Sequence, residues 1–227
     1  MRIDIKGDII RNDIAWIYDL LGYEYTSPKN VSLSLDKAKT NGEDVDVYIN
    51  SGGGEIFAGS EIYSLLRNFN GEIHIHVVGI AASAASVIAC AGKSDISPTA
   101  MMMVHNVSSS ARGDYHQMDK ESDVLKKANK AVAAAYVEKT GMTEQEALEL
   151  MDKETWLTAL EAVDLKIIDS ISAPTSISTI NLAAAAVTTL SADAIEKITN
   201  LKNENVILGK KVERYNKLFN LKEGTIE

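Results

Sequence analysis

One serine lies where the chain could present it for chemistry. Ser83 is in the stretch GIAASAAS (residues 79–86), directly after the apolar run HIHVV (residues 74–78). Small residues permit a tight turn from a strand into a helix, and the positive end of that helix's dipole would face the surroundings of the serine. The same small residues also permit close packing without any chemistry. The stretch alone therefore leaves a catalytic and a packing interpretation open.

Acyl transfer by a serine needs three further groups: a base within hydrogen-bond reach, a carboxylate that orients the base, and donors for the oxyanion. His105 directly follows the apolar run MMMV, and ligands gather at such strand ends in open α/β sheets. Asp152 and Glu154 precede Trp156 and are candidates for the carboxylate. A lone histidine after a strand is commonly structural. The joint occurrence of these groups is what favours catalysis.

Candidate oxyanion donors follow a third apolar run. Gly52, Gly53 and Gly54 come directly after VDVYIN (residues 45–50) and one serine. Glycine lets backbone N–H groups come close to a substrate oxygen. The N–H of Ala84, at the start of the helix predicted after Ser83, would point toward the same region. Three glycines are also a common turn sequence, so this signal counts only together with the others.

These candidate groups all fall at the ends of predicted elements. Apolar residues at helical spacing predict helices, and the short apolar runs between them predict strands. The predicted elements are a strand in MRIDIKGDI, a helix over Asp13–Leu21, a strand over Val45–Asn50, a helix over Ala58–Phe69, a strand in IHIHVV, a helix over Ala84–Ala91 and a strand over Met101–Val104. Strands that alternate with helices through short connections indicate βαβ units, so we expect an α/β fold with a mostly parallel sheet.

A long helix is predicted over Tyr115–Lys139, with apolar residues on one side and many charges on the other. Such a helix either projects from the domain or lies at an interface. Gly141 ends it, and Thr143 with Glu146 then forms a capping-box pattern that starts another helix. The segment WLTALEAVDLKIID is predicted to close the domain as a strand, a turn, a helix and a turn.

The end of the chain differs in character from the rest. APTSIS (residues 173–178) has the composition of a linker, and we expect a main domain over 1–172, a linker over 173–190 and a tail over 191–227. Written as heptads, the tail places mainly apolar residues at both core positions, with Asn205 among them, which is typical of a two-stranded coiled coil. A lone amphipathic helix docked on the main domain fits the same pattern, so both alternatives stand.

Composition narrows the class of protein. The chain has 227 residues and a formal net charge of −9, which argues against wrapping nucleic acid. Its one cysteine, Cys90, lies in an apolar stretch and is expected to be a buried small hydrophobe. No Cys/His cluster has metal-ligand spacing, so neither a metal nor another cofactor is expected. Without a signal peptide or a membrane-length apolar run, a cytoplasmic protein with no membrane partner is expected.

Four segments of the sequence resemble the proteolytic subunit of Clp protease. In order they are INSGGGEIFAGSEIYSLL, VVGIAASAASVIACAG, MMMVHN and ETWLTALEAVDLKIID. They are most similar to the branch of that family that phages and prophages encode beside capsid genes. The resemblance covers about Met1–Ile171. It implies a crotonase-like spiral of ββα units with a projecting long helix, a Ser–His–acid triad and assembly of copies into a ring.

Carried over position by position, the resemblance implies that Ser83 is the nucleophile and His105 the base. The amides of the oxyanion hole match Gly54 and Ala84. The adjoining substrate-binding positions are Gly53 and Glu55. Ser86 stands where the family needs no serine, and we assign it to helix packing.

Three departures from the family pattern bear on function. Glu154 stands where the family has an aspartate, so either its longer side chain reaches His105 or Asp152 takes its place. Gly52 replaces a proline, which loosens the turn. Met1 already begins the first strand, so the axial segment that contacts an unfoldase ring is expected to be missing. Dependence on an ATP-driven unfoldase is therefore not expected.

The leading hypothesis is a serine endopeptidase of the Clp type that hydrolyses peptide bonds through an acyl-enzyme. Its expected substrates are phage capsid or scaffold precursors, in the host cytoplasm or in the prohead. Two alternatives stay open. A crotonase-superfamily acyl-CoA enzyme would share the fold but needs no Ser–His pair. A non-catalytic assembly protein would keep the core only to form a ring and would act through its tail.

Overall fold

The structure, a computed structural model, describes residues 1–172, 194–204 and 206. The chain divides into two compact units, Met1–Val187 and Thr188–Glu227. All the candidate site residues lie in the first unit. In the second unit, residues 194–204 and 206 are helical. The expected linker (173–190) and most of the predicted heptad positions, including Asn205, lie outside the described residues.

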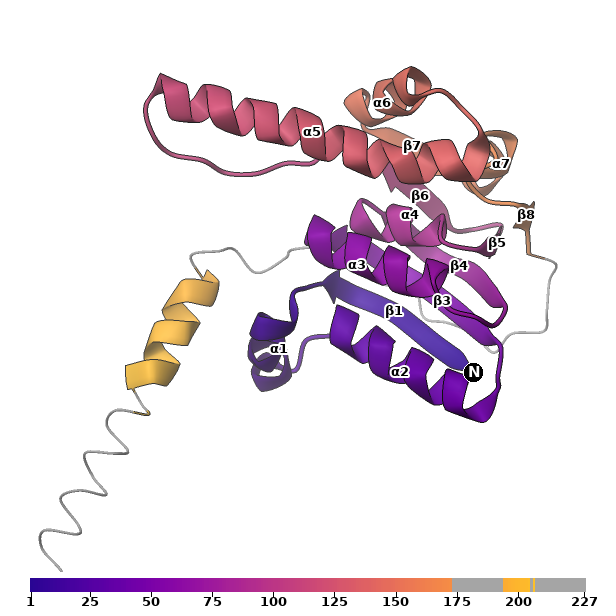
Figure 1. The fold of residues 1–227 in the computed structure, drawn as a ribbon, viewed down its shortest axis with the longest axis horizontal. Coiled ribbons are helices and arrows are strands. Elements are labelled where there is room, and N and C mark those ends of the chain that lie inside the picture. Colours follow the sequence, from indigo (N-terminus) through magenta and orange to yellow (C-terminus); the bar gives the residue numbers. More distant parts are fainter. Residues whose placement is uncertain (173–193, 205, 207–227) are drawn as a thin grey trace, which may run out of the picture. The chain divides into compact units, whose positions relative to one another are not determined.

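One sheet, of eight strands in the described part of the first unit, organises the fold (Figure 1). Its main path runs through β2 (Tyr25–Thr26), β1 (Arg2–Ile9), β3 (Val45–Gly54), β4 (Ile73–Ala82), β5 (Lys93–Ile96) and β8 (Ser170–Ile171), and all of these pairs are parallel. This agrees with the expected parallel α/β sheet. The short strands β2, β5 and β8 were not predicted from the sequence.

β4 has two different partners along one of its edges, and this arrangement positions the candidate site residues Ser83 and His105. The first half of β4 pairs with β5, whereas its end, Ile80–Ala82, pairs in parallel with β6 (Met101–Val104). β7 (Thr155–Thr158) then pairs with β6 in the antiparallel direction. Because parallel strands point the same way, the residues that follow β4 and β6 emerge side by side.

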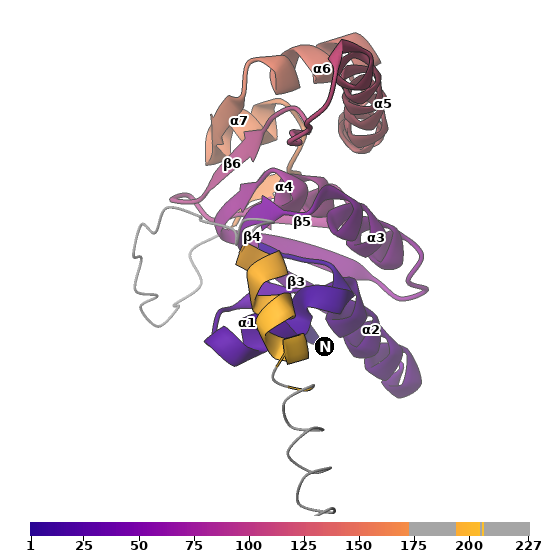
Figure 2. The ribbon, with the colours of Figure 1, turned by 90° about the vertical axis from the view of Figure 1, so that its left-hand side faces the viewer.

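Helices α2 (Pro28–Asn41), α3 (Ile56–Arg67) and α4 (Ala84–Ala89) cover one face of the sheet (Figures 1 and 2). The strands alternate accordingly. Ile3 and Ile5 of β1 are buried, whereas Arg2 and Asp4, which alternate with them, are exposed. A strand places successive side chains on opposite faces, so the main core lies between the sheet and these three helices.

The long predicted helix is α5 (Tyr115–Thr140), and it ends at Gly141, whose φ of 78° favours glycine. Its buried residues all lie in its second half. Figure 1 shows the first half extending past α3 and α4, so the projecting helix is confirmed. α6 (Glu144–Asp152) follows with the expected Thr143–Glu146 capping box, and α7 (Ala159–Asp164) follows β7.

Several helix boundaries differ from the prediction for local reasons. The helix expected from Asp13 is a 3-10 turn followed by α1 (Ala15–Leu21). α3 begins at Ile56 rather than Ala58 because the Glu55 side chain accepts hydrogen bonds from two N–H groups of its first turn.

α2 was not predicted, although its signals are local. Ser27 caps its start by accepting a hydrogen bond from the Asn30 N–H, and Pro28 occupies its first turn. Val31 and Leu35 are buried one turn apart, and Gly42 ends the helix in a left-handed conformation. Of the described helices, none combines the length and apolar character that crossing a bilayer requires.

Candidate active site

Ser83 occupies the turn between β4 and α4. Its backbone has a φ of 54° and a ψ of −125°, a conformation that costs a non-glycine residue on the order of 1–3 kcal/mol. The Ser83 N–H donates to the Met103 carbonyl at 2.9 Å. The Ser83 carbonyl accepts from both the N–H and the hydroxyl of Ser86, at 3.0 and 2.6 Å. These bonds hold the strained turn and therefore fix where the serine hydroxyl lies.

His105 comes directly after β6, the parallel neighbour of the end of β4. Its Nε2 lies 2.8 Å from the Ser83 Oγ. Both side chains are partly buried at the rim of the sheet. The two residues are 22 apart in the sequence. The pairing of Ala82 with Met103 in the ladder brings the residues that follow them together.

The two candidate carboxylates lie on either side of Lys153: Asp152 is the last residue of α6, and Glu154 directly precedes β7. Glu154 has a φ of 48° and an exposed side chain. The Asp152 carboxylate accepts a hydrogen bond from the Asn106 side-chain amide at 2.7 Å. Among the hydrogen bonds and ion pairs of the described residues, none joins His105 to either carboxylate. The structure thus places both acids near the loop that follows β6 and bonds only Asp152 into it.

Asn106 was not singled out from the sequence. Its side-chain oxygen is buried and has no hydrogen-bond partner within the described part of the chain, while its amide nitrogen holds Asp152. Its position could have identified it as a candidate site residue, because it is a polar residue directly after His105 at the end of a strand.

The glycine turn after β3 packs directly against Ser83. A Cβ added to Gly53 would lie 2.7 Å from both the Ser83 Cβ and the Ala82 carbonyl oxygen. Gly53 and Gly54 also have φ values of 100° and 147°, which favour glycine. The Gly53 N–H donates to the Ser51 hydroxyl at 3.1 Å, and that hydroxyl donates to the Gly7 carbonyl. Glycine is therefore required at positions 53 and 54 because neighbouring atoms leave no room for a Cβ and because the backbone has a positive φ.

A cavity of about 300 Å³ opens at the Ser83–His105 pair. Its lining comes from the segment after the glycine turn, from the loop after β6 and from α5. The lining residues are Gly54, Glu55, Ile56, Phe57, Ser83, His105, Asn106, Val107, Ser108, Ser109, Glu121, Val124, Leu125, Ala128, Val132 and Tyr136. The expected site residue Glu55 lies in this lining, but its carboxylate caps α3 through the N–H groups of Phe57 and Ala58. The cavity can thus hold a substrate against a hydroxyl and an imidazole.

A sequence profile of the Clp protease family matches residues 4–175. The chain belongs to the Clp protease family. It is 30% identical over 171 residues to the ATP-dependent Clp protease proteolytic subunit of Ligilactobacillus salivarius, which covers 74% of this chain and 87% of that protein. The subunit of the same name from Chlorella vulgaris is 30% identical over 180 residues, 78% of this chain and 90% of that protein.

The fold of the Clp protease family is confirmed by a solved structure. A mutant of ClpP1 from Listeria monocytogenes superimposes with a TM-score of 0.64 at 21% sequence identity, covering 77% of this chain and 92% of that one. The chain is therefore a member of a peptidase family with the ClpP-type α/β fold. The acyl-CoA enzyme and the non-catalytic assembly protein are not favoured by these comparisons.

Other reactive groups fit this assignment. Cys90 is buried as expected, and burial raises the pKa of its thiol to about 12, so it is protonated at neutral pH. Among the described residues, no group of three or more His, Cys, Asp and Glu side chains could hold a metal ion.

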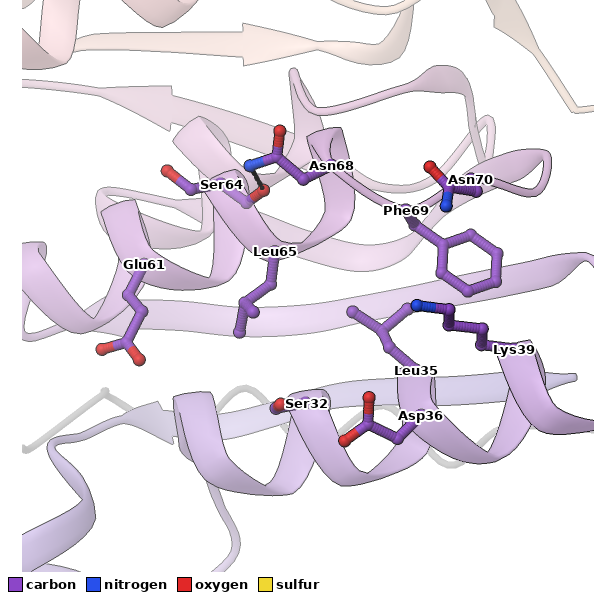
Figure 3. A pocket seen from close by; sticks show the side chains of 10 residues that line it. All are labelled: Ser32, Leu35, Asp36, Lys39, Glu61, Ser64, Leu65, Asn68, Phe69 and Asn70. Carbon is purple, nitrogen blue, oxygen red and sulfur yellow. Dashed lines mark hydrogen bonds between the residues drawn. The ribbon is translucent and has the colours of Figure 1, made fainter.

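A second hollow, of about 280 Å³, lies between α2 and α3 (Figure 3). Leu35 of α2 and Leu65 of α3 face each other across it, and Phe69 follows α3 at one end. Its rim carries the charged side chains Asp36 and Glu61. No histidine or cysteine is among its lining residues, so of these two cavities in the described part of the chain, only the one at Ser83 contains a Ser–His pair.

Proposed function

We propose that the protein is a serine endopeptidase in which Ser83 is the nucleophile and His105 the general base. The observation that carries the proposal is the 2.8 Å contact between the Ser83 Oγ and the His105 Nε2, both in the lining of the cavity. A nucleophile within hydrogen-bond reach of a base can lose its proton as it attacks. The position of Ser83 at the end of β4 aims this chemistry at a substrate in the cavity.

The reaction follows from these positions. As the Ser83 Oγ bonds to the carbonyl carbon of the scissile peptide, its proton moves to the His105 Nε2, and the carbonyl oxygen becomes an oxyanion. We assign the N–H groups of Ala84 and Gly54 as its donors. The imidazolium then gives its proton to the leaving amine as the C–N bond breaks. A water molecule, deprotonated by the same imidazole, releases the acyl group from Ser83.

We place Glu154 in the third role, with Asp152 as the alternative. The antiparallel ladder ends at the pair Val104–Thr155, and His105 and Glu154 are the next residues beyond that pair, which supports Glu154 as the neighbour of the imidazole. Asp152 already has a partner in Asn106. A carboxylate at the imidazole Nδ1 would fix the tautomer that leaves Nε2 free to accept the serine proton.

We further propose that the substrate is a polypeptide and that copies of the chain assemble into a ring. The finer proposal is that the ring processes capsid or scaffold precursors of a phage, in the host cytoplasm or the prohead. What supports it is the resemblance of VVGIAASAASVIACAG and its companion segments to the phage-encoded branch of the family.

A fluorophosphonate probe tests the nucleophile, because it forms a stable bond only with an activated serine. We expect mass spectrometry of the labelled protein to find the probe on Ser83, and Ser83→Ala to abolish labelling. Ser109→Ala is the matched control, since Ser109 lines the same cavity and has no assigned role. Labelling that persists in Ser83→Ala would overturn the proposal.

Rates of peptide hydrolysis test whether Ser83 and His105 act together in catalysis. Ser83→Ala and His105→Ala should each lower kcat by at least 1,000-fold, roughly the loss that removing one member of a triad causes, and the double variant should be no slower than either one. Additive losses, or a single variant with normal turnover, would contradict the shared role.

A further inference from the structure

A short chain of buried polar groups lies beneath Ser83. The Tyr136 hydroxyl of α5 is 2.8 Å from the Ser86 hydroxyl of α4, which is 2.6 Å from the Ser83 carbonyl oxygen. The side chains of Tyr136 and Ser86 are nearly inaccessible, at 2% and 0% exposure. Buried hydroxyls are kept only where their hydrogen bonds are satisfied, so this arrangement is specific.

Hydrogen-bond chemistry determines which group donates and which accepts at each contact between Tyr136, Ser86 and Ser83. The Ser83 carbonyl can only accept, so the Ser86 hydroxyl uses its single hydrogen there. At its contact with Tyr136 the same hydroxyl must then accept, and the Tyr136 O–H donates. Burial raises the pKa of the Tyr136 phenol far above its usual value, which keeps this donor protonated. The hydrogen bonds therefore run from Tyr136 through Ser86 to Ser83.

The last acceptor in this series of hydrogen bonds is the Ser83 carbonyl oxygen, which belongs to the peptide group between Ser83 and Ala84. The Ser83 carbonyl and the Ala84 N–H belong to the same planar unit, so fixing the oxygen fixes the direction of the N–H on the opposite side. The carbonyl oxygen also accepts from the Ser86 N–H at 3.0 Å. Two hydrogen bonds to a carbonyl polarise its peptide group, and the N–H becomes a stronger donor. Because the φ of Ser83 is strained, these two hydrogen bonds are needed to keep the peptide group in this orientation.

We propose that Ser86 and Tyr136 are positioning residues for the oxyanion hole, which hold and polarise the peptide that carries the Ala84 N–H. The inference rests on the proposed function, because it concerns the donor assigned there. It extends the packing role expected of Ser86. Tyr136 also lines the substrate cavity, so α5 contributes both to the cavity and to the support of the oxyanion donor.

The test compares Tyr136→Phe and Ser86→Ala with the wild type. Tyr136→Phe keeps every carbon atom of the side chain, so it remains informative if Ser86→Ala folds poorly. Tyr18→Phe is the matched control, since Tyr18 is equally buried and donates to Asp8 at 2.9 Å in another part of the unit. Thermal unfolding and light scattering of each variant report the fold and the assembly.

The expected result is a loss of kcat with little change in KM. Removing an oxyanion donor outright costs about 100- to 1,000-fold, and loosening one should cost less, about 10-fold for each variant. The affinity for a peptide boronic acid, whose tetrahedral adduct occupies the oxyanion hole, should fall by a similar factor. Because the two hydroxyls act in series, the double variant should be no slower than Ser86→Ala.

Two outcomes overturn the inference. One is wild-type kcat and boronic acid affinity in Tyr136→Phe and Ser86→Ala. The other is a loss that Tyr18→Phe reproduces in step with its unfolding temperature, which would indicate a merely structural role. If the wild type itself is not labelled at Ser83, the proposed function fails. If the wild type is labelled and the variants behave like it, only this inference fails.

Discussion

At the scale of single residues, two carboxylates compete for the role beside His105, and their surroundings differ. Asp152 is held by the Asn106 amide at 2.7 Å, whereas Glu154 directly precedes Thr155, the ladder partner of Val104, which directly precedes His105. Orienting and stabilising the imidazolium requires a carboxylate at Nδ1. The register favours Glu154 for this role.

We expect Glu154→Gln to lower kcat by about 100-fold or more with little change in KM, because loss of the orienting carboxylate in a triad costs up to about 10,000-fold. Asp152→Asn should lower kcat much less, since it keeps a side chain that can still bond to Asn106. Both variants are assayed on one peptide. The opposite pattern would give the role to Asp152, and two near-normal rates would indicate a Ser–His dyad.

At the scale of elements, the glycine turn at the end of β3 packs directly against the turn at Ser83 between β4 and α4. Gly53→Ala should lower both activity and unfolding temperature, because its Cβ would lie 2.7 Å from the Ser83 Cβ. Gly42→Ala is the control: its φ is also positive, at 67°, but nothing lies within 4 Å of the added Cβ. It should cost about 1 kcal/mol of stability without touching kcat. Equal kcat values for the two variants would contradict this account.

Asp169 joins three elements near the edge of the sheet. Its carboxylate accepts from the Ser94 N–H at 2.7 Å and from the Lys139 ammonium of α5 at 2.6 Å. Burial raises the pKa of Asp169, but the hydrogen bonds and the charge of Lys139 outweigh it and leave the pKa below its usual value. A pKa lowered by folding stabilises the protein above the unfolded value of 3.8, and this stability is lost as the pH falls through the folded value.

Asp169→Asn should therefore lower the free energy of unfolding at neutral pH and matter less in acid. We expect about 1 kcal/mol near pH 7, because the carboxylate is partly exposed and screened by solvent. The difference should shrink below about pH 4. Urea unfolding of the wild type and the variant at both pH values measures it, with Asp164→Asn as an exposed control. A cost that stays constant with pH would rule out the ionic contribution.

At the scale of the whole molecule, the site residues all belong to the unit Met1–Val187, and the second unit starts at Thr188. A chain ending at residue 190 should therefore keep the wild-type rate on a short peptide within about twofold. It should also keep the same assembly state, because the strands and helices that build the site remain. Peptide hydrolysis and light scattering of the truncated and full chains measure this. An inactive or aggregated truncation would show that the tail is required by the first unit.

The sequence by itself determined the features that depend on neighbours along the chain. Short-range steric and capping preferences made the turn at Ser83, the strand before His105, the glycine turn and the start of α6 predictable. α2 was within reach of the same rules, since Ser27, Pro28 and Gly42 mark its ends. The motifs also carried enough information to identify the Clp protease family.

Only the tertiary structure decided which of these features meet. The 2.8 Å approach of Ser83 to His105 follows from the pairing of β4 with β6, and the place of Glu154 from the antiparallel register of β7. The Ser86–Tyr136 bond joins residues 50 apart in the sequence. Periodicity reports which face of an element is buried, but not which distant side chain covers it. For that reason the contact between the buried hydroxyls of Ser86 and Tyr136 beneath Ser83 depends on how α5 packs against α4.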